Sequence, residues 1–208
     1  MVIKIDGIDG CGKTTLIKEL IKKFPNNAIS TIEFGTNYDE KIILNKKQYS
    51  ISNIIREIAL DDSLDVDDTE RQALFSIISR RNNRLVIPVL ETKYKYVFID
   101  RSGLSNYAYG LPLNKDFKFI YKIIVDSIEQ YDILIWIDTP IDICFNRING
   151  REKDVVEKKG IKYLYKVYIN YLNLFEDFLK AKKSIYRIDG SKSLENNVNE
   201  VYSIIMGN

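Results

Sequence analysis

Short apolar runs alternate with longer amphipathic stretches along almost the whole chain. The apolar runs lie near residues 2–6, 28–34, 95–100, 132–138 and 184–188, and their richness in Ile and Val predicts strands. A strand buried on both faces has a nearly continuous apolar run, and a parallel strand is reached through a helical crossover. The pattern therefore favours an α/β fold in which helices cover both faces of a parallel sheet.

The amphipathic stretches between these runs predict the helices. The first is expected from Lys13 to just before Pro25, because proline cannot continue a helix. A long helix is expected from about Thr69 to Leu90, with Pro88 kinking it or ending it early. The acidic segment Asp61–Asp68 is predicted to be a loop whose last residues cap that helix. Further helices are expected around Ser52–Leu60 and near 114–130, 160–182 and 193–206.

The bulk composition fits one globular domain over residues 1–208. Of the 208 residues 45% are hydrophobic, and no internal repeat or Gly- or Pro-rich linker divides the chain. A net charge of +2 gives no reason to expect nucleic acid or an anionic membrane as a partner. We expect neither a secretory leader nor a membrane span, and hence a cytoplasmic protein.

The reactive side chains that the sequence contains limit the kinds of catalysis that the protein can perform. There is no histidine, which excludes histidine-based acid–base, nucleophilic and metal-ligand chemistry. Cys11 and Cys144 lie far apart in the sequence, and this favours reduced thiols over a disulfide framework. Phosphoryl transfer remains suitable, because it depends on positioning and on cations.

Residues 7–14 read G-I-D-G-C-G-K-T and directly follow the first apolar run. This is the G-x-x-x-x-G-K-[ST] pattern of a phosphate-binding loop between a strand and a helix. Its glycines let backbone N–H groups approach a polyphosphate, Lys13 can reach the β and γ oxygens, and Thr14 offers a hydroxyl to Mg²⁺. An accidental glycine-rich turn is the alternative. The residues expected to bind the triphosphate are Gly7, Ile8, Asp9, Gly10, Cys11, Gly12, Lys13, Thr14 and Thr15.

The apolar run 96–99 ends in Asp100 and Arg101. Because the carboxyl ends of parallel strands meet at one edge of a sheet, Asp100 is expected beside the phosphate loop, where it can hold Mg²⁺ through water. Arg101 is then placed to bind a second anion in a bidentate manner. A surface ion pair at a strand end is the alternative on this dipeptide alone.

Four segments together resemble the thymidylate kinase family, in the family's order. Residues 100–109 match its signature D-R-[YHS]-x-x-S-x-x-A-[YF], and residues 5–10 are similar to its phosphate loop. Residues 137–140 and the arginines that follow resemble its L-D-x-P strand and lid, and residues 188–195 resemble its loop and helix beside the adenine. The resemblance implies a P-loop kinase with a five-stranded parallel sheet and a short lid at about 147–159. It also implies ATP, Mg²⁺, dTMP as acceptor and a homodimer.

The resemblance further implies roles for single residues. Asp9 would bind the 3′-hydroxyl of the acceptor sugar, Arg101 would bind the acceptor phosphate, and Phe75 would stack on the base, although a core aromatic on an amphipathic helix would look the same. Additional contacts are implied for Arg80, Ser105, Asn106 and Tyr109 with the acceptor, for Lys192 with the donor, and for Thr14 and Asp100 with the metal.

The catalytic cations are implied in the same way. Family members carry an arginine either in the phosphate loop or in the lid, and Gly10 stands at the loop position. Besides Lys13 and Arg101, the positive charge is therefore expected from Arg147 and Arg151, with Arg151 as first choice. A solvated charged turn is the alternative for this lid.

Several acceptor-side positions depart from the family pattern. Ile32 replaces an arginine after the second strand, and Arg56 is the candidate to replace that cation. Ser79 stands where the family has an arginine four residues beyond the stacking aromatic, with Arg80 one position later. The segment 37–50 reads as an insertion.

The expected reaction transfers a phosphoryl group from ATP to dTMP in line and gives dTDP. It needs no general base, because the attacking phosphate oxygen is already anionic. A kinase acting on another deoxynucleotide, or on a deoxynucleoside with Asp9 or Asp100 as base, is a second hypothesis. A nucleotide-dependent switch is a third, although the N-K-x-D base-reading motif is absent from the sequence.

Overall fold

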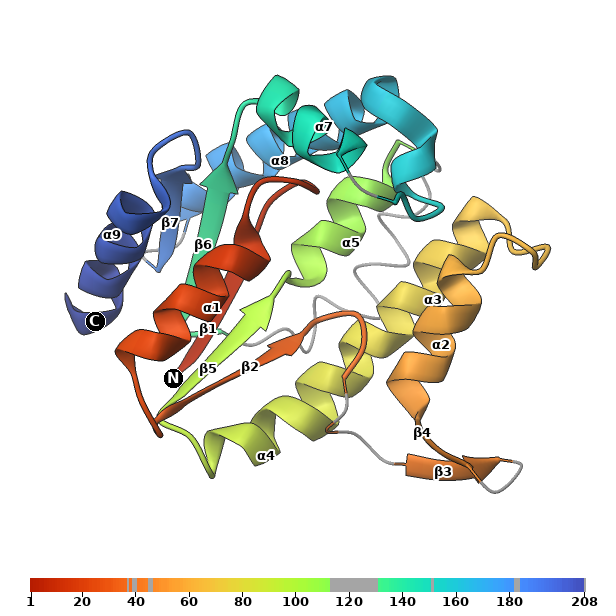
Figure 1. The fold of residues 1–208 in the computed structure, drawn as a ribbon, viewed down its shortest axis with the longest axis horizontal. Coiled ribbons are helices and arrows are strands. Elements are labelled where there is room, and N and C mark those ends of the chain that lie inside the picture. Colours follow the sequence, from red (N-terminus) through yellow and green to blue (C-terminus); the bar gives the residue numbers. More distant parts are fainter. Residues whose placement is uncertain are drawn as a thin grey trace.

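A parallel sheet forms the centre of the protein (Figure 1). The computed structural model describes residues 1–36, 38, 41–44, 47–112, 131–150, 152–181 and 184–207. Within them, the main sheet has five strands in the order β2-β5-β1-β6-β7. The strands are β1 (Val2–Asp6), β2 (Ala28–Ile32), β5 (Tyr96–Asp100), β6 (Ile133–Asp138) and β7 (Ile185–Asp189), and all their pairings are parallel. The predicted α/β class and its strands are confirmed.

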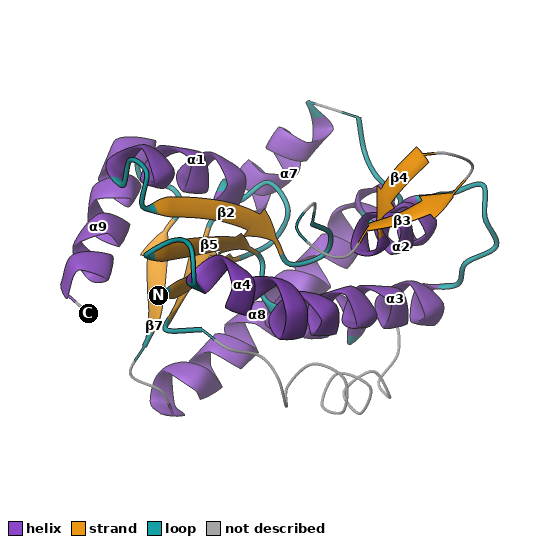
Figure 2. Ribbon diagram, turned by 90° about the horizontal axis from the view of Figure 1, so that it is seen from below, coloured by secondary structure: helices purple, strands orange, loops and turns teal. Residues whose placement is uncertain are grey.

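Helices cover both faces of this sheet, as the alternating pattern predicted (Figures 1 and 2). On one face lie α1 (Lys13–Lys23) and α9 (Leu194–Gly207), which pack against each other. On the opposite face lie α4 (Ile87–Glu91) and α8 (Gly160–Ala181). The remaining described helical segments are α2 (Ile51–Leu60), α3 (Asp68–Arg81), a π-helical segment η1 (Asn82–Val86), α5 (Gly103–Gly110), α7 (Ile141–Asn149) and a 3₁₀ turn η3 (Glu157–Lys159). The predicted helix near 114–130 lies outside the described residues.

The long helix expected from Thr69 to Leu90 forms as α3, η1 and α4 in succession. Pro88 has no N–H group and its ring crowds the preceding turn, so regular α-helical bonding cannot continue through it. The π-helical segment lies directly before it and absorbs this break, so the helical path continues to Glu91. At the start of α3, Asp67 and Glu70 form a capping box, which confirms the predicted acidic cap.

The insertion at 37–50 contains a hairpin that the sequence pattern did not predict. Strands β3 (Lys41–Leu44) and β4 (Lys47–Ser50) pair antiparallel and form a separate two-stranded sheet that leads into α2 (Figure 2). Strands of four residues are too short to show a periodicity that can be detected. None of the helices described is long and apolar enough to cross a membrane.

The carboxyl ends of the central strands carry acids. Strands β1, β5, β6 and β7 end at Asp6, Asp100, Asp138 and Asp189 respectively. In the register of the sheet Ile5 lies opposite Asp100, and Asp138 lies opposite Asp189. In an open parallel sheet, ligands bind at this edge, where the crossover connections diverge. The fold therefore places the candidate site here.

Candidate functional site

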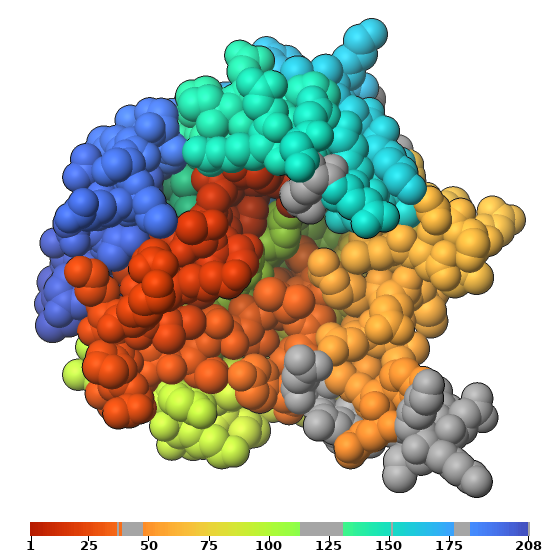
Figure 3. Space-filling model, viewed as in Figure 1, coloured from red at the N-terminus to blue at the C-terminus, as the bar shows by residue number. Residues whose placement is uncertain are grey.

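A cavity of about 650 Å³ opens at the carboxyl edge of the sheet. Figure 3 shows the molecule hollowed there, between the N-terminal loop and α1, the segment after α7, and α2. The lining residues from the predicted phosphate loop run from Asp9 through Thr15, and Asp100, Arg101, Arg147 and Lys192 join them from other elements. Gly7 and Ile8 are not among the lining residues, although Lys13 donates hydrogen bonds to both of their carbonyls.

Three glycines give the loop its path. Gly7, Gly10 and Gly12 have φ values of 146°, 80° and 106°, a region that residues with a Cβ rarely adopt. A Cβ on Gly10 would lie 2.4 Å from the carbonyl oxygen of Cys144, at the back of the loop. No side chain can therefore be added at position 10 without moving the backbone, and a catalytic arginine cannot stand there.

Gly10→Ala is expected to lower the free energy of unfolding by about 2–3 kcal/mol, or roughly 4–12 °C in Tm, because the left-handed backbone and the Cys144 carbonyl both oppose the methyl group. Thermal unfolding followed by circular dichroism measures it. Gly150→Ala is the matched control, since its new Cβ would meet only atoms 3.6 Å away or farther. Equal melting temperatures for the two variants would contradict the steric argument.

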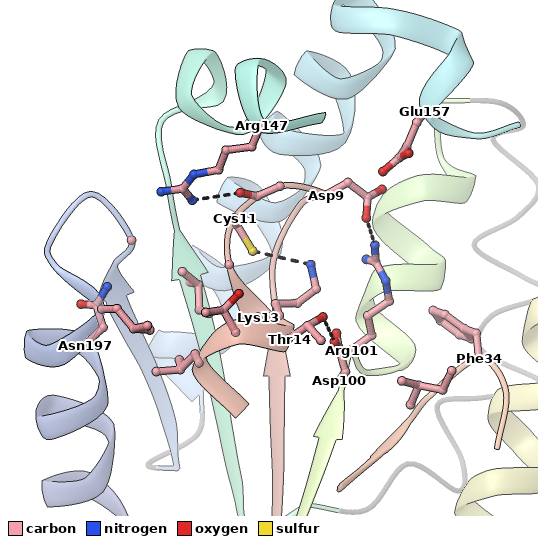
Figure 4. A pocket seen from close by; sticks show the side chains of 18 of the residues that line it. Asp9, Cys11, Lys13, Thr14, Phe34, Asp100, Arg101, Arg147, Glu157 and Asn197 are labelled. Carbon is pink, nitrogen blue, oxygen red and sulfur yellow. Dashed lines mark hydrogen bonds and ion pairs between the residues drawn. The ribbon is translucent and has the colours of Figure 1, made fainter. Parts of the chain in front are cut away.

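Lys13 begins α1, and its ammonium group lies inside the loop (Figure 4). It donates hydrogen bonds to the carbonyls of Gly7 and Ile8, at 2.9 and 3.0 Å, and to the Cys11 sulfur at 3.5 Å. Burial raises the pKa of the Cys11 thiol even though the Lys13 charge opposes this, so the thiol stays protonated at neutral pH. These hydrogen bonds fix the position of the Lys13 ammonium group, which faces the space that the loop encloses.

Thr14 and Asp100 meet at the mouth of the loop. The Thr14 hydroxyl donates to the Asp100 carboxylate at 2.5 Å. Mg²⁺ in nucleotide sites is held by one or two protein oxygens and completed by phosphates and water, and this pair of hard oxygen ligands fits that requirement. Among the described residues no group of three or more acidic or cysteine side chains could hold a metal without such help.

Arg101 stands between the loop and α5. Its φ of 81° is unusual for a residue with a side chain, and such backbone strain is concentrated at functional sites. The guanidinium pairs with the Asp9 carboxylate, donates to Ser105 Oγ at 3.1 Å, and lies 5.1 Å from the centre of the Tyr109 ring. Burial opposes its charge, but Asp9 and the neighbouring tyrosines offset burial and leave the pKa of Arg101 above its ordinary value. Arg101 is a permanent cation.

Asp9 links the same groups from the other side. Its Oδ2 accepts from the Tyr109 hydroxyl at 2.8 Å, and its backbone N–H donates to that hydroxyl at 2.9 Å. Burial raises the pKa of Tyr109 well above its usual value, so the phenol remains a donor. The structure thus brings together Asp9, Arg101, Ser105 and Tyr109, which the sequence predicted as acceptor contacts.

Asp6 supports this arrangement from below, and the sequence analysis gave it no role. Its carboxylate is fully buried and accepts hydrogen bonds from the Gly7 N–H (2.8 Å), Ser105 Oγ (2.6 Å) and the Tyr171 hydroxyl (2.7 Å). It also accepts from the N–H and the hydroxyl of Ser102. One side chain therefore fastens the phosphate loop, the Arg101 turn, α5 and α8 together.

A narrow slot of about 60 Å³ adjoins the large cavity. The rings of Phe34 and Phe75 lie 5.4 Å apart at its wall, and Gln72 and Asn106 supply side-chain amides. The predicted residue Arg80 does not reach the slot, because its side chain is exposed on α3. Phe34 and Gln72 are lining residues that the sequence analysis missed.

Arg56 lies where the slot meets the large cavity and lines both. Its Nη1 donates to the Phe34 carbonyl at 2.6 Å. Burial lowers the pKa of Arg56, and the positive charge of Arg101 lowers it further, which indicates two guanidinium groups sharing one region. Two cations held near each other form a binding site for a multiply charged anion.

The last turn of α7 and the segment that follows it cover one side of this space. Arg147 donates from Nη1 to the Gly10 carbonyl at 3.0 Å and so lies over the phosphate loop (Figure 4). Arg151, the first choice for the lid cation, lies outside the described residues. Lys158 pairs with Asp62 at 2.5 Å and Lys159 pairs with Asp68 at 2.6 Å, which links this segment to the loop after α2 and to the first residue of α3.

The opposite end of the large cavity is formed by the turn after β7 and the start of α9. Lys192 lines it and pairs with Glu200 at 3.0 Å. Asn197 lines it too, and Figure 4 places Asn197 on the other side of the phosphate loop from Phe34. The cavity thus runs from Asn197 at one end, past the phosphate loop, to Arg56 and Arg101 at the other.

Comparisons with known proteins agree on one family. The family model described as thymidylate kinase matches residues 5–201. The chain is 32% identical to the thymidylate kinase of Thermosipho africanus (strain TCF52B), over 99% of this chain and 97% of that protein. It is 28% identical to the thymidylate kinase of Thermosipho melanesiensis (strain DSM 12029 / CIP 104789 / BI429), with the same coverage, and 28% identical to that of Blochmanniella floridana, over 93% and 89%.

Proposed function

The chain belongs to the thymidylate kinase family and phosphorylates dTMP, and on that premise we propose how its residues divide the work. The observation that carries the proposal is the junction of two cavities at Asp9, Arg56 and Arg101. Phosphoryl transfer requires two anionic groups to meet in line, with cations around the transferring oxygens. The large cavity suits the triphosphate donor, and the slot suits the acceptor base.

On the donor side, the loop from Gly7 to Thr15 binds the phosphates of ATP. Backbone N–H groups at the start of α1 point toward the anion, and Lys13 exchanges its carbonyl partners for phosphate oxygens. Thr14 and Asp100 hold Mg²⁺, which when bound neutralises phosphate charge and fixes the geometry of the transferring group. Lys192 and the turn after β7 lie beside the adenine.

On the acceptor side, Arg101 and Arg56 bind the dTMP phosphate. Asp9 accepts from the sugar 3′-hydroxyl, with Tyr109 and Ser105 lining the sugar. The base lies in the slot against Phe75, where the aromatic wall favours a planar heterocycle. Because Arg56 replaces the cation missing at Ile32, two guanidinium groups still face the phosphate.

The lid, residues 147–159, supplies charge during transfer. In-line attack spreads negative charge over the equatorial oxygens of the transferring group, and a guanidinium over the loop can neutralise it. Arg147 already bonds to the loop at Gly10, and Arg151 follows it in the sequence. No general base is required, since the attacking phosphate oxygen is anionic at neutral pH.

The whole chain acts as one domain, and we propose that it works as a cytoplasmic homodimer. Ile77 on α3 and Val89 on α4 are 43% and 50% exposed, which is consistent with an apolar stripe along this helical run. Cys11 and Cys144 are buried free thiols, as expected in a reducing compartment. Light scattering coupled to size exclusion measures the mass, and a monomer at micromolar concentration would contradict the dimer.

An acceptor panel tests the proposed function. With ATP and Mg²⁺, ADP release is expected to be fastest with dTMP, slower with dUMP, at least about tenfold slower with dCMP, and absent with thymidine, because the paired arginines require a phosphate. A coupled spectrophotometric assay measures kcat/KM for each. Turnover of thymidine above every monophosphate, or ADP release that no acceptor stimulates, would overturn the proposal.

A further inference from the structure

The Asn106 amide is held at one end only. Its Nδ2 donates to Ser76 Oγ at 2.5 Å, across the contact between α5 and α3. Its Oδ1 is buried and has no hydrogen-bond partner in the described part of the chain. Asn106 is 1% exposed and lines the slot together with Phe75 and Gln72. A buried amide oxygen without a partner is costly, which suggests that a bound ligand provides the donor.

Ser76 determines which end of this amide meets the ligand. Its side chain is fully buried, and its hydroxyl donates to the carbonyl oxygen of Gln72, one turn earlier on α3, at 2.9 Å. A hydroxyl has a single proton. Because that proton is used, Ser76 Oγ can only accept from Asn106, and the amide must turn its NH₂ group toward Ser76 and its oxygen away.

The resulting relay, Asn106 to Ser76 to the Gln72 carbonyl, has a direct consequence for the base. Thymine and uracil carry an N–H donor at N3, whereas cytosine has an acceptor there. An amide oxygen fixed as an acceptor matches the first two and repels the third. We propose that Ser76 is a positioning residue for acceptor specificity: its hydroxyl holds Asn106 so that the site selects pyrimidines with a proton at N3. This inference rests on the proposed binding of the base in the slot.

Selection depends strongly on this relay because no arginine of α3 is among the residues that line the slot. Ser79, at the position where the family has one, is fully buried and donates its hydroxyl to Glu33 instead. Arg80 is exposed. Arg56 and Arg101 lie at the phosphate end, where they meet the large cavity. Among the described residues two side-chain amides line the slot, those of Gln72 and Asn106, and of these two only Asn106 has a buried oxygen without a hydrogen-bond partner. The amide of Asn106 therefore supplies the contact that distinguishes N3–H from a bare nitrogen.

Ser76→Ala tests the proposal through the ratio of kcat/KM for dTMP to that for dCMP. Loss of the hydroxyl frees the amide to rotate, so the ratio is expected to fall roughly three- to tenfold, the value of one hydrogen bond that fixes orientation. The ratio of dTMP to dUMP is expected to stay unchanged, since both bases carry N3–H. A purely structural role would lower all three kcat/KM values together and leave both ratios as in the wild type, which would overturn the proposal.

Two further variants separate the relay from general damage to the slot. Ser79→Ala removes an equally buried hydroxyl one turn along the same helix, and it should leave the dTMP to dCMP ratio as it is. In an Asn106→Ala background, adding Ser76→Ala should produce no further change in that ratio, because Ser76 acts through the amide. An additive fall in the double variant would contradict the relay. Wild-type turnover of dTMP, measured first, tests the proposed function separately.

Discussion

Arg101→Ala is expected to lower kcat/KM for dTMP by about 10³-fold while the dissociation constant of ATP changes by less than about threefold. The guanidinium is on the acceptor side of the junction, held by Asp9 and Ser105, so its removal leaves the phosphate loop with its own N–H donors and Lys13. Removal also leaves Asp9, a carboxylate, facing the acceptor phosphate without a counter-charge. Steady-state kinetics and calorimetric titration of MgATP measure the two quantities.

Arg101→Lys is a second variant, which separates the charge of Arg101 from its geometry. It keeps the charge but loses the planar fork that can bind a carboxylate and a phosphate together, so an intermediate loss of about 10- to 10²-fold is expected. The control for folding is thermal unfolding of both variants with MgATP present. If ATP affinity fell as steeply as turnover, Arg101 would belong to the donor site, and the proposed division of the junction would be wrong.

The sheet could be predicted because its physical requirement is local. A parallel strand buried on both faces is apolar over nearly its whole length, and the three central strands β1, β5 and β6 come close to this. The edge strands β2 and β7 are only partly buried, and their runs include polar residues. The phosphate loop was predictable for a similar reason, since the backbone curvature that its ligand demands can be made only with glycine at fixed spacings. The hairpin β3–β4 has no such requirement.

The acceptor slot could be predicted only in part, because its members meet through tertiary packing. Gln72, Phe75, Ser76 and Ser79 follow helical spacing and share the buried face of α3, whereas Arg80 is turned by about 100° from Ser79 and is exposed. Motif matching detects the one-residue difference in register between Ser79 and Arg80, but only the packing of α3 shows that neither side chain lines the slot.

The placement of the catalytic cation follows from packing behind the loop. Gly10 touches the backbone of Cys144 at the middle of α7, so this loop position has no room for a side chain. The same helix, one turn later, carries Arg147 to the Gly10 carbonyl. The contact that excludes an arginine from the loop thus also brings the lid arginine to it, a relation that a sequence motif does not contain.

Asp6→Ala is expected to have the largest effect on stability. The carboxylate accepts hydrogen bonds from the loop, from the turn at Arg101, from α5 and from α8, and the alanine variant would leave several buried donors without a partner. A loss of about 3–5 kcal/mol in the free energy of unfolding is expected, measured by urea denaturation. The same hydrogen bonds orient Arg101. The turnover of dTMP by Asp6→Ala should therefore fall as well, even when it is measured at a temperature at which the variant is folded.

The comparison with Asp138 isolates what is special about the position of Asp6. Asp138 ends the neighbouring strand β6 and also accepts from a tyrosine and an arginine, Tyr168 and Arg187, but Arg187 is half exposed and water can replace it. Asp138→Ala should therefore lower the free energy of unfolding by only about 1 kcal/mol.

Should Asp6→Ala prove too unstable to purify, Asp6→Asn keeps the shape of the side chain and one acceptor oxygen, and it should show an intermediate loss in the free energy of unfolding. Equal urea midpoints for the Asp6 and Asp138 variants would mean that the buried carboxylate does not join the two halves of the site.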